Sequence, residues 1–268
     1  MKISYWSPVH GQAGTTSNIL VTALIAGMVY NKECLLTQTH FNFNNMEAPL
    51  IGSNSKNAKT TDYFRDIGLD SLIRNYKASK LKQESIEDCC ISLPGTGIHL
   101  LPGTCKSNRD TFEDEMETIF INLIRTIEKH MGIVFIDLNS GNHPLSLKVI
   151  ADSDLTVVNL SQNMGFIDYF FDTYYHLISS KTFYLFGNYD CNSKYNIYNI
   201  RRRYRKYITP QNSGAIPYNT MYHDAQCDGK IIEFIKENHQ IRRSDHNGFF
   251  MVKSINAADK ILKQAGIQ

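Results

Sequence analysis

A segment near the start of the chain combines glycine, hydroxyl and amide residues in a way that suits phosphate binding. Residues 7–18 read SPVHGQAGTTSN, and they lead into an apolar segment that we expect to be a helix starting near Thr16. Amides at a helix N-terminus point toward an anion, and glycines let the backbone approach a phosphate closely. A Walker A loop ends in Gly-Lys-Ser/Thr, however, and Thr15 stands at the lysine position. The pattern alone therefore also allows an ordinary tight turn before a helix.

The elements that would position this loop alternate along the chain. Short runs typical of β-strands lie before helix-length segments, at residues 2–7, 33–39, 97–101, 132–138, 155–160 and 182–186, with a weak run ending at Ile216. Such alternation predicts an α/β fold with a doubly wound, mostly parallel sheet flanked by helices on both faces. Asp137 directly follows the apolar run IVFI, so we expect it at the sheet edge where ligands of open α/β folds bind.

The composition limits the classes of protein to which the chain could belong. We expect residues 1–268 to form a single domain, with a helical insertion at about 52–92 and a closing amphipathic helix at about 247–266. The net charge of +2 argues against a generally basic nucleic-acid coat. The six cysteines show no CxxC pair, which is typical of reduced, cytoplasmic proteins. The longest apolar run, residues 19–30, is about half of the ~20 residues that a membrane span needs.

The order and spacing of these segments resemble the ParA/MinD family of P-loop ATPases, which belongs to the SIMIBI class. HGQAGTTS is similar to the family's deviant Walker A motif, KGGxGKT[ST], and GIHLLPGT is similar to its third strand with the LPG ending. GIVFIDLNSG resembles its Walker B and switch II run. The resemblance implies a P-loop NTPase fold that binds ATP and Mg²⁺. A threonine in place of the P-loop lysine resembles the TadZ/CpaE branch, which helps to place pilus machinery.

The resemblance also implies roles for individual residues. It places nucleotide contacts in the loop and after two later strands, at Gly11, Gln12, Ala13, Gly14, Thr15, Thr16, Ser17, Asn188 and Pro217. It places metal binding at Thr16 and Asp137, and catalytic positions at His10, His40 and Asp137. His10 stands where the family has a trans-acting lysine, and His40 stands where it has a water-positioning aspartate. The alternatives are an ordinary loop histidine for His10 and a solvent-facing residue at a strand end for His40.

These departures from the family pattern affect hydrolysis more than binding. Thr15 cannot supply the positive charge that stabilises the γ-phosphate in the transition state, whereas the loop amides, Thr16 and Asp137 are retained. Together with these departures, the resemblance implies an ATP-dependent homodimer with weak or lost hydrolysis, which positions or assembles pilus or secretion machinery in the cytoplasm or peripherally at the membrane. The alternatives are an active partition ATPase that binds DNA nonspecifically and an interaction module without nucleotide.

A basic run near the C-terminal third is the expected contact for DNA or anionic lipid. Residues 201–206 read RRRYRK, and the candidate contacts are Arg201, Arg202, Arg203, Arg205 and Lys206. It is the only dense basic run in a nearly neutral chain, so a polyanion would be attracted to it. A solvated helix face is the alternative.

Overall fold

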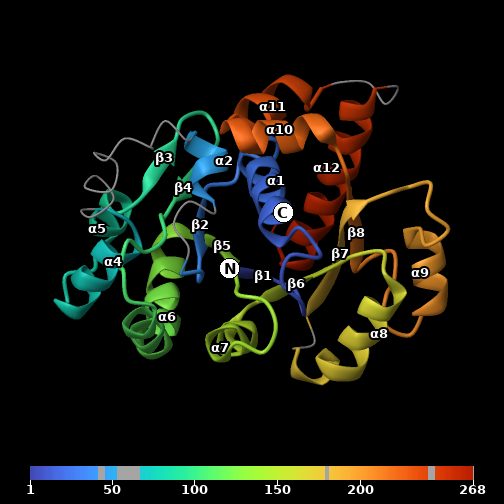
Figure 1. The fold of residues 1–268 in the computed structure, drawn as a ribbon. Helices are drawn as coiled ribbons and strands as arrows, with labels where there is room; N and C mark the ends of the chain where they lie inside the picture. Colours follow the sequence, from blue (N-terminus) through green and yellow to red (C-terminus); the bar gives the residue numbers. More distant parts are fainter. Residues whose placement is uncertain (42–45, 53–66, 179–180, 241–244, 268) are drawn as a thin grey trace.

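The computed structural model describes residues 1–41, 46–52, 67–178, 181–240 and 245–267 (Figure 1). These residues include an eight-stranded sheet with the strand order β3-β4-β2-β5-β1-β6-β7-β8. Neighbouring strands run parallel, apart from the antiparallel pair β3 and β4. This architecture confirms the predicted α/β fold class.

The strands are β1 (Lys2–Trp6), β2 (Cys34–Gln38), β3 (Ile91–Leu93), β4 (Ile98–Leu100), β5 (Ile133–Asp137), β6 (Leu155–Leu160), β7 (Thr182–Tyr189) and β8 (Ser213–Pro217). The α-helices are α1 (Thr15–Met28), α2 (Glu47–Ile51), α4 (Gly68–Lys77), α5 (Gln83–Asp88), α6 (Arg109–Met131), α7 (Pro144–Asp152), α8 (Met164–Thr173), α9 (Ile197–Arg203), α10 (Thr220–Asp228), α11 (Ile231–Asn238) and α12 (His246–Gln264). A short 3₁₀ turn, η2 (Tyr175–Leu177), follows α8.

Helices cover both faces of the sheet (Figure 1). Because side chains alternate along a strand, β1 sends Ile3 and Tyr5 into the apolar core shared with α1, α11 and α12, and Trp6 into the core shared with α6, α7 and α8. Helix α1 packs against both the sheet and the pair α11 and α12, and its residues 18–27 are buried throughout. A helix that is apolar on all sides suits this position. Its first turn is therefore held firmly beneath the loop that precedes it.

Side-chain caps set where several of the later helices begin. Asn108, Asn163, Asn196 and Asn219 each accept a hydrogen bond from a backbone amide in the first turn of α6, α8, α9 and α10. Such a cap satisfies one of the amides that have no partner within the helix. Polar residues that end the preceding loops thus mark these helix starts in the sequence.

The region between β2 and β4 contains one element that the sequence does not predict. Within the expected helical insertion, α4 begins at Gly68, because Ile67 is extended and Gly68 has a φ of +81°. Residues 53–66 lie outside the described part of the chain. Strand β3 was not predicted, since three residues are too few to show a period. Helix α12 lies where the closing helix is expected.

Candidate functional site

The loop between β1 and α1 is an open turn whose backbone depends on glycine. Gly11 has a φ of +74°, and Gly14 has a φ of +63° at the N-cap of α1. Glycine adopts this left-handed conformation without the steric cost that a side chain would add. His10, Gly11 and Gln12 are exposed, whereas Ala13 is buried. The loop therefore presents backbone at the surface while its last part is anchored in the fold.

The loop after β5 fixes the start of this turn. The backbone amide of Gly141 donates to the carbonyl of Ser7 at 2.9 Å, and the Trp6 indole donates to the carbonyl of Gly141 at 3.0 Å. The Trp6 ring lies edge-on to Tyr174, with ring centroids 5.1 Å apart. The two loops at the carboxyl ends of β1 and β5 are thus joined directly.

A buried amide network fixes the end of the turn. The Asn18 Nδ2 atom donates to the Ala13 carbonyl at 3.0 Å and to Asn159 Oδ1 at 2.8 Å. Strand β7 passes so closely that a Cβ atom on Gly187 would lie 2.2 Å from the Ala13 carbonyl oxygen. A side chain at Gly187 would push β7 away from the loop, so the conformation of the loop depends on this glycine.

Thr16 and Asp137 meet at the N-terminus of α1. The Thr16 hydroxyl donates to Asp137 Oδ2 at 2.6 Å, and Asp137 is fully buried at the end of β5. Among the described residues, no group donates a hydrogen bond to Asp137 Oδ1. A buried carboxylate oxygen without a partner is costly unless an ion or water completes it. Carboxylate and hydroxyl oxygens are ligands suited to Mg²⁺, so this pair fits the metal site that the sequence predicts.

His40 lies against the same carboxylate. Its Nε2 atom is 3.5 Å from Asp137 Oδ2, and its side chain is only 11 % exposed. The alternative of a solvent-facing histidine is therefore wrong, because the chain turns inward after β2. Burial alone would lower the pKa of His40, but the interaction with Asp137 outweighs burial and raises that pKa above its ordinary value. The catalytic role of His40 stays a prediction.

Sequence reasoning missed Glu47, which is buried at the start of α2. Its carboxylate accepts hydrogen bonds from the Gly103 amide at 2.7 Å and from Gln38 Nε2 at 3.2 Å. Burial raises the pKa of Glu47, although these hydrogen bonds act in the opposite direction. Glu47 thereby joins the segment after β2 to the LPG ending after β4. An acidic residue beside the apolar residues Met46 and Leu50 was the signal in the sequence.

The two nucleotide contacts expected after later strands, Asn188 and Pro217, lie at the ends of β7 and β8. Asn188 places its Nδ2 atom 3.4 Å from where a Cβ on Gly14 would lie, so its amide sits beside the loop. Pro217 lines a cavity of about 710 Å³ together with Tyr189 and Tyr218. These residues therefore share one edge of the sheet with Thr16 and Asp137. His10 lies at the exposed apex of the loop, and no hydrogen bond within the described residues links it to Asp137.

The basic run divides into structural and accessible residues. Arg201 is half-buried, and its guanidinium donates to Ser213 Oγ at 2.8 Å and to the Ser213 carbonyl at 3.0 Å. Burial lowers the pKa of Arg201. These hydrogen bonds tie α9 to β8, and a contact of Arg201 with a polyanion stays a prediction. Arg203 is exposed and pairs with Asp168 at 3.1 Å, and Arg202, Arg205 and Lys206 are exposed as well.

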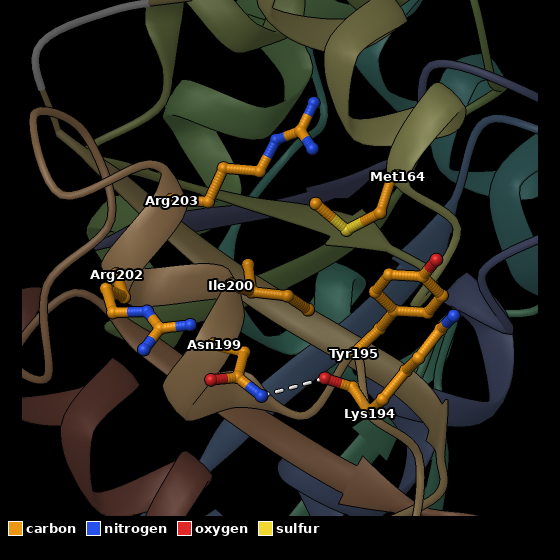
Figure 2. Close-up of a pocket in the computed structure, with 7 residues that line it drawn as sticks. All are labelled: Met164, Lys194, Tyr195, Asn199, Ile200, Arg202 and Arg203. Atoms are coloured by element: carbon orange, nitrogen blue, oxygen red, sulfur yellow. Dashed lines mark hydrogen bonds between the residues drawn. The ribbon is translucent and has the colours of Figure 1, made fainter.

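Arg202 and Arg203 line a cavity of about 400 Å³. Figure 2 shows Arg202 across this cavity from Lys194 and Tyr195, with Ile200 between them. The Lys194 ammonium lies 5.0 Å from the centroid of the Tyr195 ring. A cation, Lys194, and an aromatic ring, Tyr195, thus lie beside the run, and the sequence prediction included neither residue.

Comparison with solved structures places this geometry in a known fold. The chain aligns with a ParA family ATPase from Chlorobium tepidum at a TM-score of 0.69 and 10 % identity, covering 96 % of this chain and 98 % of that one. It aligns with the cell division ATPase MinD from Pyrococcus furiosus at a TM-score of 0.67 and 10 % identity, covering 98 % of each chain. The chain has the ParA/MinD fold.

A third alignment is with the septum site-determining protein MinD from Pyrococcus horikoshii, whose structure is a complex with Mg-ADP. It has a TM-score of 0.66 and 13 % identity, and it covers 99 % of this chain and 97 % of that one. No protein-family model matches the chain, and no curated protein sequence matches it either. The likeness is therefore one of fold, and the roles of residues in this ParA/MinD-fold chain rest on its own geometry. Within the described residues, no helix is long and apolar enough to cross a membrane.

Proposed function

We propose that this ParA/MinD-fold chain binds ATP and Mg²⁺ and uses them as a conformational switch with slow hydrolysis. The contact between Thr16 and Asp137 carries this proposal, because it sets a hydroxyl and a partly unpaired carboxylate at the start of α1. The backbone amides of residues 11–16 supply the partial positive charge that a phosphate needs. The Mg-ADP complex of the Pyrococcus horikoshii MinD supports the choice of ligand.

In this proposal, different residues bind the phosphates and the metal. The amides around Gly11 and Gly14 would hold the phosphates, and the Thr16 hydroxyl and Asp137 would hold the metal. Bound Mg²⁺ neutralises charge on the β- and γ-phosphates. Losing one charge-assisted contact at Thr15 weakens binding by roughly 10- to 150-fold, from ~1.5 to 3 kcal/mol. A family ATPase of micromolar affinity would still be filled at millimolar ATP.

Hydrolysis is the weaker part of the mechanism. Thr15 carries no positive charge to meet the charge that develops on the γ-phosphate. His40, when protonated, places a positive charge beside Asp137, at the edge of the sheet where the nucleotide is expected. It cannot orient water as a carboxylate would unless it loses that proton, and the raised pKa opposes this loss. The arrangement therefore favours a state that keeps its nucleotide.

The cellular role that we propose is that of a positioning or assembly factor. The solved structures with this fold include ATPases named for cell division and septum placement, which supports a positioning role. Thr15 at the lysine position supports the narrower proposal of pilus or secretion machinery as the partner, in the cytoplasm or at the membrane surface. The accessible residues Arg202, Arg205 and Lys206 favour a second candidate, a partition ATPase that binds DNA nonspecifically.

Titration calorimetry of ATP with and without Mg²⁺ tests the proposal. Gly14→Val should abolish binding, because a side chain there meets Asn188 and the left-handed φ strains the loop. Gly95→Val is the matched control, since Gly95 has a φ of +72° in the turn between β3 and β4, far from the loop in the sequence. Absence of binding at millimolar ATP, or equal binding by Gly14→Val and the parent, would refute the nucleotide proposal.

A further inference from the structure

The backbone at the end of β7 is strained at Asn188. This residue has a φ of +47°, a left-handed conformation that is uncommon outside glycine and that asparagine tolerates better than most other residues. The pairing of β7 with β8 also shifts register between Phe186 and Tyr189, so the strand bulges where Asn188 lies. Strained residues persist where their surroundings hold them in place, and they gather at functional sites. The contacts of Asn188 therefore indicate what the strain serves.

Two glycines, one in the loop and one in β7, place the Asn188 side chain beside the loop. Its Nδ2 atom lies 3.4 Å from where a Cβ on Gly14 would lie. The neighbouring Gly187 lies against the Ala13 carbonyl and the Asn18 amide, so the strand cannot move toward the loop. The side-chain amide of Asn188 thus lies beside Gly14, the N-cap of α1, and the residue is exposed to solvent. An exposed amide needs a further contact to stay in one orientation.

Helix α10 supplies that contact through His223. The His223 Nε2 atom lies 3.3 Å from Asn188 Oδ1. Because an amide oxygen only accepts, Nε2 is the protonated nitrogen in this hydrogen bond. The imidazole packs against the Tyr218 ring, with centroids 5.0 Å apart and an interplanar angle of 30°. The backbone amide of Tyr218 in turn donates to the Tyr189 carbonyl at 3.1 Å, which ties the pair back to β7.

We propose that His223 is a positioning residue for the nucleobase. It holds the Asn188 amide with Oδ1 turned toward α10 and Nδ2 toward the loop, so that the amide is already oriented when a base enters beside it. Tyr189, which follows Asn188, and Tyr218, which packs against His223, both line a cavity of about 710 Å³ that is large enough for a purine. This inference rests on the proposed nucleotide binding, and it adds a residue that the sequence did not indicate.

The test compares a ligand that has a base with one that has none. Calorimetry with Mg²⁺ would measure the affinities of ATP and of inorganic tripolyphosphate for the parent, His223→Phe and His223→Gln. His223→Phe keeps a ring against Tyr218 but has no donor, so we expect ATP affinity to fall about 3- to 10-fold while tripolyphosphate affinity is unchanged. His223→Gln keeps a donor and should bind ATP within about 2-fold of the parent. His130→Phe, at the end of α6, is the control and should change neither affinity.

A double variant with Asn188→Ala shows whether the two residues act together. If His223 acts through Asn188, adding His223→Phe to Asn188→Ala should cost no further ATP affinity. The inference is overturned if His223→Phe binds ATP as the parent does, if it loses ATP and tripolyphosphate equally, or if His223→Gln is as weak as His223→Phe. A parent that binds neither ligand would instead overturn the proposed function. The melting temperature of each variant establishes that it is folded.

Discussion

At the scale of single residues, the proposal of slow hydrolysis depends on Thr15. It is the first residue of α1, beside the Thr16 and Asp137 pair, and it has no charge. Thr15→Lys would place an ammonium group where the β- and γ-phosphates are expected, so single-turnover hydrolysis should rise about 10- to 100-fold. Thr15→Met has a similar length without the charge and should give no acceleration. A parent that already turns over at ~1 per second would contradict the slow-hydrolysis proposal.

His40 gives a second prediction at this scale, one that concerns stability and pH. The pKa of His40 is raised in the folded state above its ordinary value of 6.5, so the protonated form stabilises the fold. This contribution is fully present below that ordinary value and is lost as the pH rises through the raised pKa. Without nucleotide or Mg²⁺, His40→Gln should therefore lower the free energy of unfolding more at about pH 5.5 than at about pH 8.5.

Denaturant unfolding of parent and variant at both pH values measures this difference. Glu47, whose pKa is also raised, is present in both proteins, so its titration largely cancels in the comparison. His99→Gln is the control, because His99 contacts Ser92 on the edge strand β3, away from Asp137. An equal loss of stability at both pH values would show that His40 acts through packing and not through its charge.

At the scale of elements, β7 lies so close to the loop that the site is sensitive to a side chain at Gly187. A Cβ on Gly187 would lie 2.2 Å from the Ala13 carbonyl oxygen and 2.5 Å from Asn18 Nδ2. Gly187→Ala should destabilise the protein by about 1–3 kcal/mol, because backbone must move to make room. It should also weaken ATP binding, since the loop moves with it. Thermal unfolding and calorimetry measure the two effects.

Gly165→Ala in α8 is the matched control. The nearest heavy atom to its added Cβ is Asn163 Oδ1 at 3.5 Å, which is ordinary contact, and alanine favours a helix. We expect this variant to be as stable as the parent or slightly more stable, with unchanged ATP binding. If Gly187→Ala behaved in the same way, the loop would not depend on the close approach of β7.

Two arginines of helix α9 are expected to have different roles, one in stability and one in polyanion binding. Arg201 bonds to Ser213 on β8, so Arg201→Met should cost about 1–3 kcal/mol of stability. Arg202 is exposed, so Arg202→Met should leave the melting temperature nearly unchanged but reduce any binding of DNA at low salt. Fluorescence anisotropy with a DNA duplex measures the binding. If Arg202→Met and the parent bound DNA with equal affinity, Arg202 would be a solvent-facing residue that does not contact DNA.

The elements differ in how well the sequence predicts them. The strands that end at Asp137 and Leu160 are buried on both faces, so their apolar runs show where they lie. Strand β3 is too short for a periodic signal, and the start of α4 depends on the left-handed Gly68, which packs beneath Pro102. The contact of His40 with Asp137 and that of Glu47 with Gly103 join segments far apart in the chain, and the contact of Arg201 with Ser213 depends on how α9 packs on the next strand. Local pattern carries no information about such pairings.

At the scale of the whole molecule, the parts of the site meet at one edge of the sheet. The loop before α1, Asp137 at the end of β5 and Asn188 at the end of β7 come from positions far apart in the chain. Their shared edge follows from parallel strands, whose carboxyl ends lie on the same side. His10 differs from them, because it is exposed at the loop apex. A residue in that position is better placed to meet a second molecule than the site of its own chain.

This placement leads to a prediction about assembly. ATP with Mg²⁺ should convert the parent from monomer to dimer, and His10→Ala should weaken that dimer. The affinity of the His10→Ala monomer for ATP should stay near that of the parent, because His10 lies away from Thr16 and Asp137. His10→Lys, which restores a cation, should dimerise at least as well as the parent.

Light scattering with ATP, with ADP and without nucleotide measures the molecular mass of the protein in solution. Gly14→Val should remain monomeric under all three conditions. The same mass under all three conditions would rule out a nucleotide-dependent dimer. A dimer that is insensitive to His10→Ala would leave the histidine as an ordinary loop residue, because a group that reaches across the interface must change the association constant when it is removed.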